Sequence, residues 1–450
     1  MKSEIISKPV KSGINVRFKN KSYNLIYPKK IWKAYPFKHL LTSNYIPLAT
    51  ISLPLLLNLG KIHYNYPAPI FYERYKELME KDLPSSTYDY THQNATKMIK
   101  KFLQIKFNFK GKQQKKEIKH KIKQIKSKHH AIIPLSLGKD SLLTLAVSQE
   151  IGLNPASVYI NDTVSPKENR LKLVFGKKLS KEFKLKHYVV TNNIEKINDF
   201  DTWKKPETSI NYSHMITGFC FLALPFVNFF NSKYIILGNQ QDMNFTFKDK
   251  EGYLIYPAFD QHKYWTNIQN KMLNAFTEHE VHITSVIQPL TNIAIIKILH
   301  KRYPKIAKYQ ISCDCINTSR DKRWCNKCNK CARLALFMKA FGINTKKLGL
   351  RNLFDKKNKH LYALFSGKGV DRYEKSIEAK EQQLLGFLLA SRLGERGYLI
   401  DFFKKHYLEE AELNEERLRK KYFGIWESTL PKEIKQDVCS IYKEEMQKTN

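Results

Sequence analysis

The amino-acid sequence predicts an α/β fold in which helices cover both faces of a parallel sheet. From residue 131 onward, short apolar segments alternate with longer segments of helical apolar spacing, and this alternation favours right-handed crossovers between parallel strands. The first 104 residues mix strand-like and helical patterns, and the chain after residue 336 has helical spacing. We therefore expect an α+β domain before the sheet domain and a helical region after it.

The amino-terminal part is expected to form its own domain, residues 1–104. It contains stretches in which apolar and polar residues alternate and stretches with helical spacing, for example at 17–26 and 72–81. It carries no chemical motif. Residues 105–129 are rich in lysine, and isoleucines recur at helical spacing within them. We interpret them as a basic, solvated helix that links two domains; a helix that binds nucleic acid is the alternative.

The central domain is expected to span residues 130–335. Strands are predicted at 131–137, 157–161, 187–191 and 234–238, and helices at 141–151, 166–183 and 212–230. Ligands of such sheets bind beyond the carboxyl ends of the strands. The polar residues at these ends are therefore candidate ligand-binding residues: Ser136, Asn161, Asp162, Asn192 and Asn239.

The last domain is expected to span residues 336–450 and to be helical. Apolar residues recur at helical spacing over 332–341, which begins just before this boundary, and over 378–393 and 398–407. A charged helix is predicted at 408–421.

The charge of the chain favours anionic partners. Its 78 Lys and Arg residues against 41 Asp and Glu give a formal net charge of +37, which attracts nucleotides, sugar nucleotides, nucleic acid or anionic membranes. No export signal and no apolar run of about 20 residues is visible, so we expect a cytoplasmic protein without a transmembrane segment.

A phosphate-binding loop is predicted where the first core strand meets the first core helix. A strand-to-helix turn directs backbone amides and a helix amino terminus at an anion. Gly138 permits close approach of the backbone, Lys139 supplies a charge, and Ser136 and Ser141 supply hydroxyl donors. Asp140 could hold the Mg²⁺ that accompanies a nucleotide. The loop lacks the longer glycine-rich turn of kinases and GTPases.

Five cysteines crowd into nineteen positions and indicate a metal site. They are Cys313, Cys315, Cys325, Cys328 and Cys331. Two-residue spacings let a turn present thiolates to one tetrahedral Zn²⁺, which takes four ligands, so one upstream cysteine would be spare. Four thiolates leave no open position, and the zinc is expected to be structural. An iron–sulfur cluster, redox-active thiols and ordinary core cysteines are the alternatives.

The segment 136–141 resembles the Ser-Gly-Gly-x-Asp-Ser signature of the PP-loop ATP pyrophosphatases, which cleave ATP to AMP and pyrophosphate. Leu137 stands where that family usually has its first glycine. Together with a cysteine quartet, the loop is similar to that of 7-cyano-7-deazaguanine synthase, a much shorter enzyme. A fuller resemblance is to the ATP-dependent UDP-N-acetylmuramoyl-L-alanyl-L-glutamate epimerase family. It covers about residues 130–390, through 136–141, Gly238-Asn239, 288–290, Ser312-Cys313 and 323–331, and more weakly 367–381.

The resemblance implies ATP, Mg²⁺ and Zn²⁺ as cofactors, with Cys313 as the first metal ligand. The family adenylates the terminal glutamate carboxylate of a sugar nucleotide-linked peptide, inverts its α-carbon, and releases AMP and pyrophosphate. Adenylation removes the carboxylate charge and so makes the α-proton more acidic. Lys139 and Asp140 are then catalytic, and Gly238 and Asn239 join the ATP site.

The region expected to face the substrate departs from that family. It comprises residues 240–244 and 257–265, and within it Asp260 and His262 are candidate acid–base residues. The favoured hypothesis is an enzyme that adenylates a carboxylate on an anionic small molecule. The alternatives are a PP-loop enzyme of nucleoside or tRNA modification, which the basic charge would suit, and a zinc-stabilised scaffold without catalysis.

Overall fold

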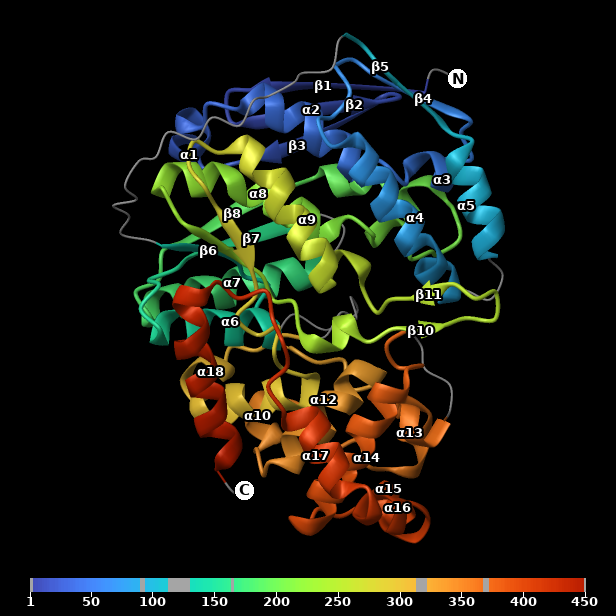
Figure 1. Cartoon of the computed structure of the whole chain (residues 1–450), viewed down its shortest axis with the longest axis vertical. Coiled ribbons are helices and arrows are strands. Elements are labelled where there is room, and N and C mark those ends of the chain that lie inside the picture. The colour runs from blue at the N-terminus through green and yellow to red at the C-terminus, as the bar shows by residue number, and fades with distance from the viewer. Residues whose placement is uncertain are drawn as a thin grey trace.

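The computed structural model contains a ten-stranded sheet flanked by helices, with a helical region beside it (Figure 1). It describes residues 3–89, 94–111, 130–162, 166–312, 322–366 and 372–448. Within these residues the sheet has the strand order β12-β9-β6-β7-β8-β3-β2-β1-β4-β5. The predicted α/β class and the helical carboxyl-terminal region are confirmed; the sheet is mostly parallel, and its amino-terminal strands are antiparallel.

Five parallel strands form the half of the sheet that carries the predicted site. They are β6 (Ala131–Pro134), β7 (Ala156–Asp162), β8 (His187–Asn192), β9 (Tyr234–Ile236) and β12 (His282–Thr284). The first of them in the chain, β6, lies between β7 and β9, so the strand order reverses at β6. Ligands of doubly wound sheets bind at such a reversal point, beyond the carboxyl ends of the strands.

Helices cover both faces of this half-sheet. Successive side chains of a strand point to opposite faces, so each face has its own apolar side chains to bury. Ile132 of β6 belongs to the core that includes α8 (Met215–Phe230) and α9 (Lys263–Leu273). Its neighbours Ala131 and Ile133 belong to a second core with α6 (Lys139–Glu150) and α10 (Asn292–Arg302). Helix α7 (Pro166–Glu182) connects β7 to β8.

The amino-terminal residues continue the same sheet. Strands β1 (Glu4–Val10), β2 (Gly13–Phe18) and β3 (Lys21–Ile26) are antiparallel, and β3 pairs with β8. Strands β4 (Lys61–Tyr64) and β5 (Lys106–Phe109) extend the sheet beyond β1. Their side chains share one hydrophobic core with α8. Five helices pack in this part: α1 (Lys29–Ala34), α2 (Lys38–Ala49), α3 (Leu53–Leu57), α4 (Tyr72–Tyr88) and α5 (Ala95–Leu103).

Two element predictions need correction. The start of the proposed linker helix is the strand β5, because its backbone pairs with β4 at the edge of the sheet; residues 112–129 lie outside the described part. The predicted helix at 408–421 is two helices, α16 (Leu408–Leu413) and α17 (Glu415–Phe423), which meet at Asn414. There the backbone leaves helical geometry, with φ −99° and ψ 0°, and the Asn414 side chain bonds the Glu410 carbonyl.

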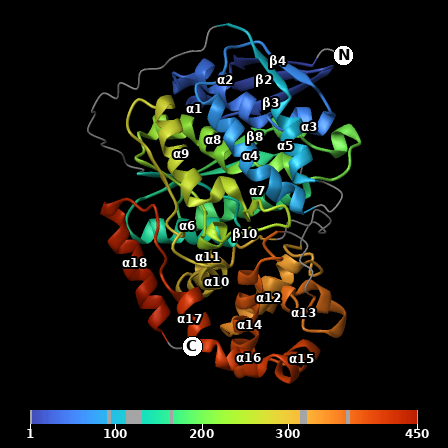
Figure 2. The same ribbon diagram turned by 45° about the vertical axis from the view of Figure 1, so that its right-hand side comes forward.

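The carboxyl-terminal helices form a separate hydrophobic cluster below the sheet (Figure 2). It contains α12 (Asn329–Ala340), α14 (Ile377–Arg392), α15 (Tyr398–His406) and α17. The last helix, α18 (Lys432–Gln447), returns to the core shared by α6 and α10. The shorter elements are α11 (Pro304–Ala307), α13 (Ala363–Ser366) and the hairpin β10 (Phe247–Lys248) and β11 (Leu254–Ile255). In the described ranges, no helix has both the length and the apolar character needed to cross a membrane.

Candidate functional site

The predicted phosphate loop connects β6 directly to the amino terminus of α6. Gly138 is the N-cap residue and Lys139 begins the helix. Within the loop, the hydroxyls of Ser136 and Ser141 lie 3.3 Å apart, and the Ser141 hydroxyl donates to the Gly138 carbonyl at 3.2 Å. The first amides of a helix have no acceptor within the helix, so this end carries partial positive charge. The loop therefore has the geometry of an anion-binding turn.

Leu137 adopts a left-handed backbone conformation, with φ +60°. This conformation costs a leucine roughly 1–2 kcal/mol, whereas glycine adopts it freely. The leucine side chain is buried in the core of α6 and α10, and the Leu137 carbonyl accepts from the Ile311 amide at 2.8 Å. Apolar burial and this bond hold a turn that glycine would form without strain.

Lys139 is buried beside two polar partners. Its ammonium lies 2.5 Å from Asp140 Oδ1 and donates to Gln240 Oε1 at 3.1 Å. Burial lowers the Lys139 pKa, and the Asp140 carboxylate opposes that effect. The Asp140 side chain keeps about a third of its surface exposed and lines the cavity described below. Lys139 thus supplies a positive charge that its two partners hold in place. Asp140 supplies an accessible carboxylate of the kind that Mg²⁺ prefers.

The segment after β9 packs against the start of α6. A Cβ on Gly238 would lie 3.2 Å from Asp140 Cβ, so this position favours glycine. The next residue, Asn239, is buried; its side-chain Nδ2 donates to Thr266 Oγ1 at 3.4 Å, and its backbone carbonyl accepts from Ser285 Oγ at 2.6 Å. The close approach of Gly238 to Asp140 joins the two segments that the resemblance assigns to one ATP site.

A cavity of about 230 Å³ opens at the reversal point of the sheet. Ser136, Asp140 and Ser141 line one part of it, and Gly238 and Asn239 another. Its apolar lining comes from β6, β7, the end of β9 and the first turns of α8: Pro134, Leu135, Val158, Ile160, Ile216, Phe219 and Leu237. Tyr159 and Gln261 complete the lining. The cavity therefore has a polar end, at the loop, beside apolar walls, as small-molecule sites do.

Three polar residues predicted at strand ends lie elsewhere. Asn161 and Asp162 end β7 but do not line this cavity, and the Asp162 carbonyl accepts from the Asn169 side chain. The side-chain Nδ2 of Asn192 donates to Tyr45 Oη and to Glu195 Oε1. Of the five polar residues predicted at strand ends, Ser136 and Asn239 line this cavity and the other three do not.

Asp260 and His262 flank the cavity residue Gln261, and both contact helix ends. The Asp260 carboxylate is buried and accepts from the Ile216 amide at 2.7 Å, in the first turn of α8. Burial raises the Asp260 pKa to about 8. His262 caps α9 by accepting from the Tyr264 amide at 3.2 Å, and burial lowers its pKa to about 4. Their role in proton transfer stays a prediction.

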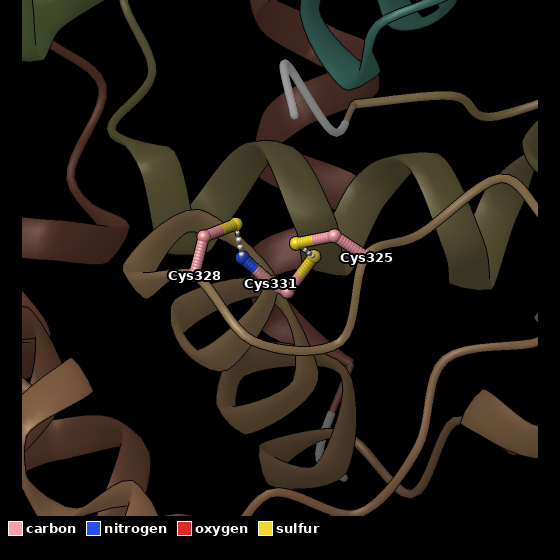
Figure 3. Close-up of side chains that lie close together, drawn as sticks. All are labelled: Cys325, Cys328 and Cys331. Atoms are coloured by element: carbon pink, nitrogen blue, oxygen red, sulfur yellow. Dashed lines mark hydrogen bonds between the residues drawn. The ribbon is translucent and has the colours of Figure 1, made fainter. Parts of the chain in front are cut away.

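Three of the predicted metal ligands come together at the start of α12. The sulfurs of Cys325, Cys328 and Cys331 all lie within 4.8 Å of one another (Figure 3). Cys325 Sγ and Cys331 Sγ are 3.7 Å apart. Ligands of tetrahedral Zn²⁺ with bonds of about 2.3 Å are separated by about 3.8 Å, so this spacing fits one ion. The three cysteines could bind a metal such as zinc; Cys313 and Cys315 lie outside the described residues.

The cluster lies at a helix amino terminus. Cys328 is the N-cap residue of α12, and its sulfur accepts from the Cys331 amide at 3.4 Å. The partial positive charge of a helix amino terminus stabilises a thiolate and thereby prepares it for metal binding. Cys220 is buried away from this cluster in the core of α8.

Further polar groups lie near the loop, and two of them belong to the segment 240–244 that was expected to face the substrate. Gln240 contacts Lys139, and Asp242 is a buried carboxylate that accepts from the Asn292 amide at the start of α10 and from Tyr373 Oη. Both follow the Gly238-Asn239 pair directly. Ser312 accepts from the Lys139 amide at 3.2 Å. Gln240 and Asp242 are polar residues that follow a core strand, and this was the sequence signal that could have indicated their place near the loop.

We compared the sequence with protein-family models and with curated proteins. No protein-family model matches the chain, and no curated protein matches it.

Proposed function

We propose that this protein is an ATP-dependent adenylating enzyme that cleaves ATP to AMP and pyrophosphate and activates a carboxylate on an anionic substrate. The observation that carries the proposal is the cavity at the reversal point of the sheet. Its lining combines the hydroxyls of Ser136 and Ser141 with the accessible carboxylate of Asp140. This combination of groups suits a magnesium-bound polyphosphate.

In the proposed reaction, ATP places its β- and γ-phosphates on the loop, and its base lies along the apolar wall formed by β7 and α8. A substrate carboxylate oxygen attacks the α-phosphorus, and the bond to the bridging oxygen of pyrophosphate breaks. Mg²⁺ held by Asp140 would neutralise charge on the departing pyrophosphate. The Lys139 ammonium, held by Asp140 and Gln240, adds a positive charge beside it.

The resemblance of the loop and the cysteine segment favours one such reaction, epimerisation of the L-glutamate in a UDP-N-acetylmuramoyl dipeptide. The acyl adenylate would lose its α-proton to a base, regain a proton on the opposite face, and then lose AMP to water. Asp260 and His262 flank Gln261 of the cavity lining and remain the candidate acid–base residues. The cysteine cluster would hold a structural zinc through Cys325, Cys328 and Cys331.

The test is an analysis of nucleotide products in the presence of candidate acceptors. The purified protein is incubated with ATP and Mg²⁺ together with cell-wall dipeptide precursors, other carboxylates or tRNA. AMP and pyrophosphate formed with a small carboxylate would support the proposal. Turnover with tRNA alone would favour the RNA-modification alternative, and no pyrophosphate with any acceptor would favour a non-catalytic scaffold.

A further inference from the structure

Ser312 lies beside the phosphate loop although it is far from the loop in the sequence. The preceding residue, Ile311, donates its amide to the Leu137 carbonyl at 2.8 Å, which holds the two segments together. The Lys139 amide then donates to Ser312 Oγ at 3.2 Å. Ser312 is 6% exposed, so its hydroxyl is largely shielded from water.

A second donor reaches the same oxygen from the other side. Gln310 Nε2 donates to Ser312 Oγ at 3.0 Å, and Gln310 Oε1 lies 2.7 Å from His300 Nε2. Burial lowers the His300 pKa to about 4, so the imidazole is neutral near pH 7 and carries one N–H. When that N–H is on Nε2, it donates to Oε1 and turns the Gln310 amino group toward Ser312.

The number of bonds at Ser312 leaves one donor unused. A hydroxyl oxygen accepts two hydrogen bonds and donates one. Lys139 and Gln310 occupy both acceptor directions, so the O–H of Ser312 must donate. Among the residues that the structure describes, no acceptor for it is found. Buried donors normally have partners, so an acceptor is expected here.

We propose that this acceptor is a phosphate oxygen of ATP, which makes Ser312 a further phosphate-binding residue of the loop. The Lys139 amide belongs to the first turn of α6, where partial positive charge gathers. Its bond to Ser312 polarises the hydroxyl, because hydrogen bonds in a chain strengthen one another. Gln310 and His300 act as positioning residues. This inference rests on the proposed ATP site.

The experiment measures binding of Mg·ATP and of inorganic pyrophosphate by calorimetry, together with melting temperature. Ser312→Ala should weaken pyrophosphate binding by about tenfold or more, because a hydrogen bond to a charged group is lost. Ser312→Thr keeps the hydroxyl and should bind within about threefold of the parent. Ser440→Ala, which removes an exposed hydroxyl on α18, is the matched control and should change nothing.

Gln310→Met tests the positioning role and serves if Ser312→Ala fails to fold. It keeps the side-chain volume, removes the amide that orients Ser312, and should weaken pyrophosphate binding by about threefold. Pyrophosphate binding equal to that of the parent in the folded Ser312 or Gln310 variant would overturn the inference alone. A parent protein that binds neither Mg·ATP nor pyrophosphate would overturn the proposed function as well.

Discussion

Gly238 and Asp140 lie so close together that a Cβ on Gly238 would be 3.2 Å from the Cβ of Asp140. The contact brings the end of β9 against the first turn of α6, on the two sides of the point where the strand order reverses. The Asp140 carboxylate is thereby held at the edge of the cavity, where a metal-bound polyphosphate could reach it.

Asp140→Ala should reduce ATP turnover to background while the melting temperature changes little. The substitution removes a proposed Mg²⁺ ligand that is only partly buried, so little packing is lost. Pyrophosphate release and thermal unfolding check the two halves of the prediction. Asp437→Ala, at an exposed position of α18, is the control. Equal turnover in the Asp140 variant and the parent would place the ATP site elsewhere.

At most helical or extended positions an alanine variant is more stable than a glycine variant. At Leu137 we expect the opposite order of stability. Both variants lose a buried leucine side chain, which costs about 2–5 kcal/mol. Because the backbone here is left-handed, Leu137→Gly should be more stable than Leu137→Ala by about 1 kcal/mol. Chemical unfolding measures the difference.

Leu143 provides the matched control for that comparison. It is buried within α6, where the backbone is helical, so Leu143→Ala should be more stable than Leu143→Gly by about 1 kcal/mol. The same order at both positions would show that the turn at Leu137 is not left-handed.

The cysteine cluster predicts about one zinc per chain in the purified protein. Cys328→Ser should lose the metal and melt at a lower temperature, since a structural metal contributes free energy of folding. Metal analysis and thermal unfolding measure both effects, with Cys439→Ser on α18 as the control. A metal-free protein of unchanged stability would contradict a structural site.

Asp260 predicts a specific dependence of stability on pH. Burial raises the pKa of Asp260 to about 8, whereas the pKa of an aspartate in an unfolded chain is about 3.9. Between these values the folded protein retains a proton that the unfolded chain has lost. The free energy of unfolding contributed by this group should therefore fall by about 1.4 kcal/mol per pH unit as pH rises.

Asp260→Asn isolates that effect. Asparagine has no ionisable proton, and its carbonyl can still accept from the Ile216 amide. Urea unfolding of the parent and the variant between about pH 5 and about pH 8 should show a steeper decline for the parent. Parallel curves would contradict the raised pKa of Asp260.

Much of the sheet half that carries the site was predictable from local patterns. Apolar segments at 131–137, 157–161, 187–191 and 234–238 were placed near four of its strands, because buried parallel strands are short and apolar. The strand β12 (His282–Thr284) was missed because Ile283 is the only apolar residue in it, so it forms no apolar segment. The continuation of the sheet into β1–β5 was also missed, since pairing between distant segments leaves no local pattern.

The loop was predictable from its residue types, whereas its supporting groups were not. Gly138, Lys139, Asp140 and Ser141 are consecutive and follow a strand, so local chemistry identified them. The contact of Ser312 with the Lys139 amide spans 173 residues of sequence. Nothing in the local sequence around Ser312 determines that proximity, because it results from the tertiary packing of the chain.

The central claim is that a carboxylate oxygen attacks the α-phosphorus of ATP. The most direct measurement supplies an acceptor that supports turnover, with oxygen-18 in its carboxylate, and analyses the nucleotide products by mass spectrometry. The account predicts AMP and pyrophosphate in equal amounts, no ADP, and one oxygen-18 atom in each AMP, because the acyl adenylate forms through that oxygen. ADP and phosphate as the main products, or AMP without the label, would contradict it.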